Sequence, residues 1–193
     1  MRLVAIAVLG AVLAGCSLTT GEAPQSYDLI APRKIEGLAG GTRAQLLIRE
    51  PVSVRALNSE RIAVRMKGSE FSYIAGAQWT DSLPKLVQAR LMETFERTGR
   101  ARAVGRPGDN LAIDYQILTE IRAFQLETGG GSRSVVEISV RLLNDRNGRV
   151  VATRQFAASV PLSSEAPSKV VAGMNAALGD VLSQIVLWTY GRI

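Results

Sequence analysis

The sequence predicts an α+β domain in which a mostly antiparallel sheet carries two helices packed on one face. The chain has 193 residues, a length that suits a single domain behind a short N-terminal segment. Its second half holds long stretches of alternating apolar and polar side chains, which indicate antiparallel strands. Two other stretches repeat apolar residues at helical spacing, so each helix is expected to lie across the sheet.

Short strands are predicted in the first third of the chain. Residues 44–49 contain an apolar run that stops before Pro51, which is typical of a buried strand. Residues 61–66 and 70–74 follow one another around the glycine-containing turn 67–69. This arrangement favours a β-hairpin.

An amphipathic helix is predicted to begin after Ser82 and to end at Gly99. Side chains suited to the N-cap stand at 79–82, and Pro84 fits a first helical turn. Apolar residues then recur every three or four positions: Leu83, Leu86, Val87, Leu91 and Phe95. Glycine is a common helix stop.

Long strands are predicted in the second half. In residues 111–126 the apolar side chains change parity part-way, so we expect a bulge or bend at 119–122. Residues 136–142 alternate regularly, and residues 150–160 return after the turn sequence NDRNG at 144–148. Two such runs around a turn of this composition predict a hairpin.

A second helix is predicted to close the domain. It is expected to start at 163–167, a segment with serine, glutamate and proline. One apolar stripe follows, formed by Val170, Val171, Met174, Leu178, Val181, Leu182, Ile185 and Trp188. A helix with such a stripe buries it against a sheet.

The N-terminus resembles a bacterial lipoprotein signal. Arg2 precedes an apolar run of about a dozen residues, which is shorter than the ~20 needed to span a bilayer as a helix. The run ends in Leu13-Ala14-Gly15-Cys16, which matches a lipobox, and Cys16 is the single cysteine of the chain. We therefore predict a signal peptide at 1–15, a lipidated Cys16 with a flexible tether to residue 26, and a periplasmic domain at 27–193.

The predicted anchor is the covalent lipid on Cys16, with palmitate among the expected acyl chains. Several acyl chains, at ~0.8 kcal/mol per buried CH₂, anchor a protein stably. Ser17 follows the cysteine, in place of the aspartate that retains lipoproteins at the inner membrane in enterobacteria-like sorting. We therefore expect an outer-membrane location facing the periplasm.

The composition excludes most catalytic chemistries. The chain has no histidine and one cysteine, so neither a histidine-dependent triad nor a thiolate zinc site can form. Asp114, Gln116 and Glu120 share one strand parity, but no motif supplies a second partner, and a solvated sheet face explains them equally well. Residues 129–132 lack the lysine and helix start of a phosphate loop. We expect no catalytic residue, no metal site, no cofactor and no enzymatic activity.

The net positive charge of the chain indicates which kinds of partner it can bind. The formal net charge is +6, and a secreted lipoprotein rarely meets nucleic acid, so we expect none as a partner. Anionic lipid head groups or an acidic protein are the more sensible counter-charges. Because lysine and arginine are scattered, a merely solubilising role is an equal alternative.

Several segments, in order, resemble the ABC-type transport auxiliary lipoproteins, which include PqiC/YmbA-type lipoproteins. The segments that carry the resemblance are the lipobox, Tyr27-Asp28-Leu29, the strand at 46–51, Arg61-Ile62 with Glu70-Phe71-Ser72-Tyr73, and Gln78-Trp79-Thr80-Asp81-Ser82-Leu83. Gln78 departs from the arginine usual before the tryptophan. The resemblance covers essentially the whole chain after the signal.

The resemblance implies a non-enzymatic periplasmic component of a lipid-trafficking system. Its partners would be an MCE-domain protein, an ABC permease and an ATPase, and the chain would dock the MCE component. Since MCE proteins form rings, a homo-oligomeric ring of this chain would suit such a partner. An alternative function is activation or assembly of another envelope machine, such as a peptidoglycan synthase or the lipopolysaccharide assembly machinery.

Two aromatic residues are candidates for partner contact, Tyr73 and Trp79. Both lie in the segments that carry the resemblance. Large aromatic side chains serve as interface anchors, but they serve more often in a core. For Trp79, and likewise for Trp188 at the end of the second helix, a core role is the favoured alternative.

Overall fold

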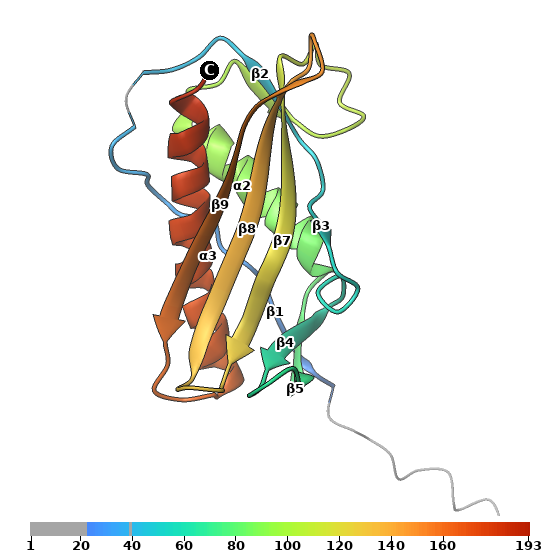
Figure 1. Cartoon of the computed structure of the whole chain (residues 1–193), viewed down its shortest axis with the longest axis vertical. Coiled ribbons are helices and arrows are strands. Elements are labelled where there is room, and N and C mark those ends of the chain that lie inside the picture. Colours follow the sequence, from blue (N-terminus) through green and yellow to red (C-terminus); the bar gives the residue numbers. More distant parts are fainter. Residues whose placement is uncertain (1–22, 39) are drawn as a thin grey trace, which may run out of the picture.

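The structure is a computed structural model that describes residues 23–38 and 40–193. The predicted signal peptide, Cys16 and most of the predicted tether lie outside these residues. The three longest strands are β7 (Tyr115–Glu127), β8 (Arg133–Asn144) and β9 (Arg149–Pro161), which pair antiparallel in that order. Helices α2 (Leu83–Thr98) and α3 (Pro167–Tyr190) lie on one face of these strands (Figure 1). The predicted α+β fold class is confirmed.

The free edge of β7 accepts three short strands, one after another. β2 (Gln45–Ile48), β3 (Val52–Ser53) and β4 (Arg61–Arg65) all pair parallel to β7, from its start to its end. The run at 44–49 is thus a strand, and Leu46 and Ile48 are fully buried. Strand β7 is therefore the centre of the sheet.

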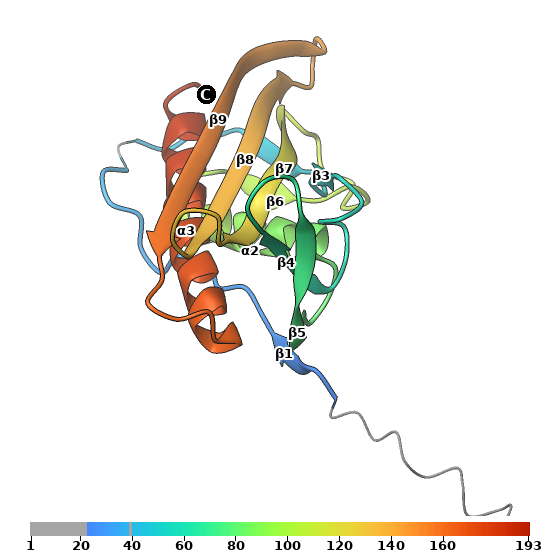
Figure 2. The ribbon, with the colours of Figure 1, turned by 60° about the horizontal axis from the view of Figure 1, so that its bottom comes forward.

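The outermost strands are also short. β5 (Phe71–Trp79) is antiparallel to β4, which confirms the predicted hairpin, although β5 continues five residues beyond it. β1 (Gln25–Tyr27) pairs parallel to the last residues of β5, and β6 (Ala103–Gly105) pairs parallel to β2. Figure 2 shows β1, β4 and β5 beside one another, away from α3.

The predicted irregularity in β7 is present. The pairing with β8 shifts register between Ile121 and Ala123, inside the expected interval. Apolar residues up to Ile121 and from Phe124 onward therefore face the same core, although their parity differs. The strand begins at Tyr115, so residues 111–114 belong to the preceding loop rather than to the strand.

The ends of α2 agree only in part with the expected caps. Ser82 occupies the N-cap position, but its side chain makes no capping hydrogen bond. Pro84 has no N–H at the second helical position, which removes one of the two usual donors for such a bond. Gly99 ends the helix as predicted, with a left-handed φ of 59° and its N–H bonded to the carbonyl of Glu96.

Helix α3 is the central helix of the core. The side chains of its predicted stripe are all buried, and Trp188 packs edge-on against Phe156 with ring centroids 5.6 Å apart. Within the described residues, α3 is the one helix long and apolar enough to cross a membrane. Its apolar side chains pack against β8 and β9 instead, so its hydropathy reflects burial in the domain.

Candidate functional site

Tyr73 lies in a small aromatic cluster on the sheet face opposite the helices. Alternation along the β4–β5 pair sends Ile62 to the helix-covered core and Tyr73 to the other side. The guanidinium carbon of Arg61 stands 3.6 Å from the centre of the Tyr73 ring, and Phe71 packs edge-on at 5.6 Å. Tyr73 is half-buried and Phe71 is 40% exposed. This cluster is accessible to a partner.

Trp79 occupies a different environment. Its side chain is 1% exposed and packs edge-on against Phe124 of β7 at 5.8 Å. The structure therefore places Trp79 in the core, the favoured of the two roles that the sequence allowed, and not beside Tyr73. Trp188 is likewise buried.

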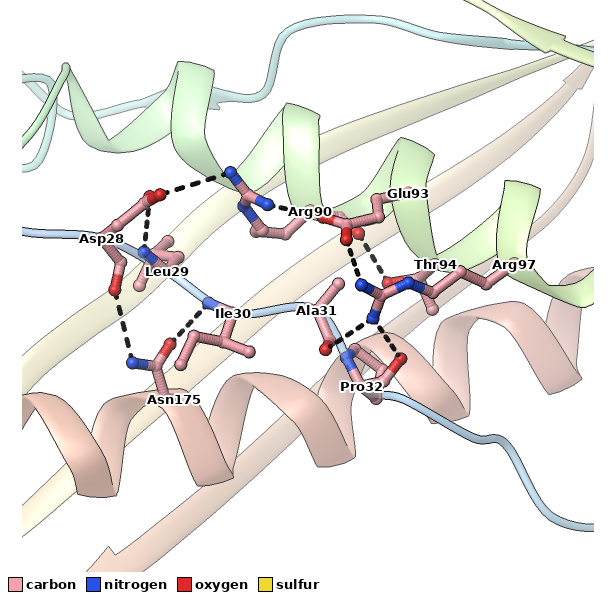
Figure 3. A network of polar contacts seen from close by, with 10 residues as sticks. All are labelled: Asp28, Leu29, Ile30, Ala31, Pro32, Arg90, Glu93, Thr94, Arg97 and Asn175. Carbon is pink, nitrogen blue, oxygen red and sulfur yellow. Dashed lines mark hydrogen bonds and ion pairs between the residues drawn. The ribbon is translucent and has the colours of Figure 1, made fainter.

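An N-terminal strap, residues 28–32, crosses between the two helices (Figure 3). From α3, the Asn175 side chain accepts a hydrogen bond from the Ile30 N–H at 2.8 Å and donates to the Asp28 carbonyl at 3.4 Å. From α2, Arg97 donates to the carbonyls of Ala31 and Pro32, both at 3.1 Å. The strap is thus tied to both helices through its own backbone.

Ion pairs on α2 orient the arginines that face the strap. Glu93 pairs with both Arg90 and Arg97, and Arg90 also reaches Asp28 at 3.5 Å. Beyond the strap, a cavity of about 440 Å³ opens between residues 32–38 and the end of α2. The helix residues that hold the strap, Asn175, Arg90 and Arg97, could not be recognised from the sequence, because an isolated Asn or Arg on a helix carries no signal of a distant backbone partner.

Replacement of Asn175 by alanine should loosen the strap. The substitution leaves the Ile30 N–H and the Asp28 carbonyl without their partner, and lost hydrogen bonds of this kind cost about 1–2 kcal/mol in total at a partly exposed site. We expect a lower free energy of unfolding and faster amide hydrogen exchange at residues 28–32. Asn175→Asp keeps the acceptor for the Ile30 N–H but cannot donate to the Asp28 carbonyl, so we expect the Ile30 amide to exchange more slowly in N175D than in N175A. Equal exchange in N175A and the native protein would contradict this assignment.

The carboxylates of the β7 region do not converge. Asp114 accepts hydrogen bonds from the Gln45 N–H at 2.9 Å and from Arg146 Nε at 3.0 Å. Glu120 pairs with Arg122 at 3.1 Å and lies six residues, ~20 Å of extended chain, beyond Asp114, which immediately precedes β7. The described residues hold no group of three or more acidic or cysteine side chains that could bind a metal.

Asp114 should contribute acid sensitivity. The hydrogen bond from the Gln45 N–H and the nearby Arg146 guanidinium hold the pKa of Asp114 below its ordinary value of about 3.9. A lowered folded-state pKa adds stability that is present above about pH 4 and is lost as the pH falls through the folded value. We expect Asp114→Asn to lower the urea midpoint at pH 7 and to differ little from the native protein near pH 2. A difference that does not change with pH would contradict this prediction.

Comparison with known proteins gives the family. The sequence model described as ABC-type transport auxiliary lipoprotein component matches residues 27–186. An uncharacterized protein of Bradyrhizobium diazoefficiens, bll6063, is 37% identical over 185 residues, which cover 94% of this chain and 50% of that protein. The chain therefore spans about half the length of this curated relative.

Solved structures agree with the fold. Protein XCC0632 from Xanthomonas campestris, assigned to family DUF330, superposes with a TM-score of 0.79 and 27% identity, covering 86% of this chain and 94% of that one. A second, uncharacterized protein superposes with a TM-score of 0.68 at 11% identity, covering 86% and 97%. With a family match that runs from Tyr27 to Val186, close to the end of α3, the chain belongs to the ABC-type transport auxiliary lipoprotein family.

Proposed function

We propose that this chain is an auxiliary lipoprotein of an ABC/MCE-type transport system, anchored in the outer membrane through lipid on Cys16. In this role it docks the MCE-domain component and supports lipid trafficking between the two membranes. The observation that carries the proposal is the family match over residues 27–186, which begins a short tether after a lipobox cysteine. Membership in a lipoprotein family supports a location at the cell envelope.

The proposed role is structural rather than catalytic. Asp114 and Glu120 are each engaged by a separate arginine, which supports a protein that works without a cofactor or a chemical step. Energy would come from the ATPase and permease of the same system. A ring of several copies, if it forms, would match the ring of an MCE protein.

A pull-down from solubilised envelopes tests this function. The tagged chain is compared with a Cys16→Ala variant, which cannot receive the lipid and should leave the outer-membrane fraction. We expect the native chain to recover an MCE-domain protein together with its permease and ATPase. Recovery of peptidoglycan synthases or lipopolysaccharide assembly proteins without an MCE protein would overturn the proposal in favour of the alternative function.

A further inference from the structure

The positive charge of the domain gathers at one end. We define the distal end as residues 40–45, 99–114, 144–149 and 190–193, which come together at the top of Figure 1 around the β8–β9 turn and the C-terminus. These four segments contain seven arginines, three aspartates, and neither lysine nor glutamate. The distal end therefore has four positive side-chain charges in excess.

The rest of the chain is close to neutral. The opposite end, at residues 65–71, 127–134 and 161–169, carries four basic and three acidic side chains. The rest of the sequence after Cys16 carries eleven basic and eleven acidic side chains. Most of the net charge of the chain after Cys16 thus lies at the distal end, although lysine and arginine are scattered along the sequence.

Local contacts already occupy the three aspartates of the distal end. Asp114 binds Arg146, Asp109 accepts from the Arg106 N–H at 2.8 Å, and Asp145 accepts from the Gln116 side chain. By contrast, the exposed guanidinium groups of Arg43, Arg102 and Arg106 make no hydrogen bond or ion pair among the described residues. These three cations are available for an external anion.

The distal end also offers concave and apolar surface. Arg43, Arg102 and Arg146 line a cavity of about 600 Å³ together with Asp114. Val150 and Val151 of β9, the two residues that follow the distal-end segment 144–149, are 52% and 44% exposed. Arginine is enriched and lysine depleted at protein interfaces, whereas a lipid surface is bound equally well by lysine and is usually met by aromatic anchors.

The orientation of the chain points this surface away from the predicted anchor. β1 runs parallel to β5, so the chain enters β1 from the side of Phe71, at the opposite end from the β8–β9 turn (Figure 1). From Cys16 to Gln25 nine residues can reach at most ~30 Å. The distal end therefore lies at the end of the domain opposite to the point at which the tether enters it.

We infer that the distal end is a docking surface for an acidic protein segment, whose carboxylates bind Arg43, Arg102 and Arg106. Arginine suits this role because its planar guanidinium binds a carboxylate through two parallel hydrogen bonds. This inference rests on the proposed function in one respect: the MCE-domain protein is chosen as the first binding partner to be tested. Electrostatic docking of this kind depends on salt, because exposed charges are screened.

Charge reversal at the distal end tests the inference. The full-length lipidated chain in detergent is bound to the purified periplasmic part of the MCE protein, and Kd is measured at low and high salt. We expect R43E/R102E/R106E to weaken binding at least about tenfold and to remove most of the salt dependence. The control R55E/R65E/K67E makes the same charge change on exposed side chains away from the distal end and should change Kd less than about threefold. Equal losses in both variants would overturn the inference.

If the MCE protein does not bind the native chain at all, the proposed function fails. A second measurement then tests the docking surface independently of that function. A photo-crosslinking amino acid is placed at Arg106 in the native host, with Lys67 as the matched position at the other end. We expect crosslinks from position 106 to a peptide rich in Asp and Glu, whichever protein supplies it. Crosslinks to lipid, to peptides without acidic residues, or to nothing would overturn the inference.

Discussion

Trp79→Ala should destabilise the domain by about 3–5 kcal/mol, the usual cost of removing a fully buried large aromatic side chain. The side chain is 1% exposed and packs edge-on against Phe124, so alanine leaves a cavity between β5 and β7 that neighbouring side chains cannot fill. Urea unfolding followed by circular dichroism measures this loss. A domain of this size has roughly 5–15 kcal/mol of stability in all, so the variant should be much more easily unfolded.

The same substitution at Tyr73 separates a core role from a contact role. Tyr73→Ala removes the stacking with Arg61 and a hydrogen bond to the Ala56 carbonyl at 3.3 Å, on a half-buried face. We expect a loss of only about 1–2 kcal/mol. If Tyr73 contacts a partner, Y73A should reduce recovery of that partner while the domain stays folded. Equal unfolding midpoints for W79A and Y73A would contradict the description of Trp79 as fully buried and Tyr73 as half-buried.

The regular elements could be predicted because their periodicity is local. The stripes of α2 and α3 and the alternation in β8 are each set by a burial pattern that repeats within one segment. The bulge in β7 was also predictable, since a parity change in one strand requires an extra residue if both halves face one core. Each of these features is determined by a segment of about a dozen consecutive residues.

The parallel pairing of β2, β3 and β4 with β7 could not be predicted. Each of these strands has five residues or fewer, and their partner lies more than fifty residues further along the chain. No turn sequence fixes such a register, so it is decided by packing across the whole sheet. The length of β5 beyond the hairpin has the same origin, because it depends on β1.

The candidate site was predicted less well than the fold. Tyr73 and Trp79 stand six residues apart in similar sequence surroundings, yet one is accessible and the other is in the core. The pairing of β5 with β4 shifts register between Arg61 and Ala63 of β4. Because of this irregularity, Tyr73 and Trp79 of β5 lie on opposite faces of the sheet. The strap contacts of Asn175 join residues about 145 positions apart, and such contacts leave no local pattern to read.

Gly173→Ala should also have a large effect, although alanine is ordinarily the better helix residue. A Cβ at this position would lie 2.7 Å from Ser134 Oγ and 2.8 Å from Leu162 Cδ2. Helix α3 is in close contact with β8 here, where Ser134 donates to the Val170 carbonyl at 2.9 Å. Overpacking of this kind costs typically 1–3 kcal/mol, and displacement of the serine adds the loss of a buried hydrogen bond. We expect a net loss of about 2–4 kcal/mol in urea unfolding.

Gly179→Ala is the matched control, since it makes the same change six residues further along the same helix. No atom lies within 4 Å of a Cβ at Gly179, so only the helix propensity changes, and we expect a gain of up to about 1 kcal/mol. The double variant Gly173→Ala with Ser134→Ala should recover part of the loss, because the nearest clashing atom is gone. If G173A and G179A shift the unfolding midpoint in the same direction, α3 and β8 are not packed as closely as the structure describes.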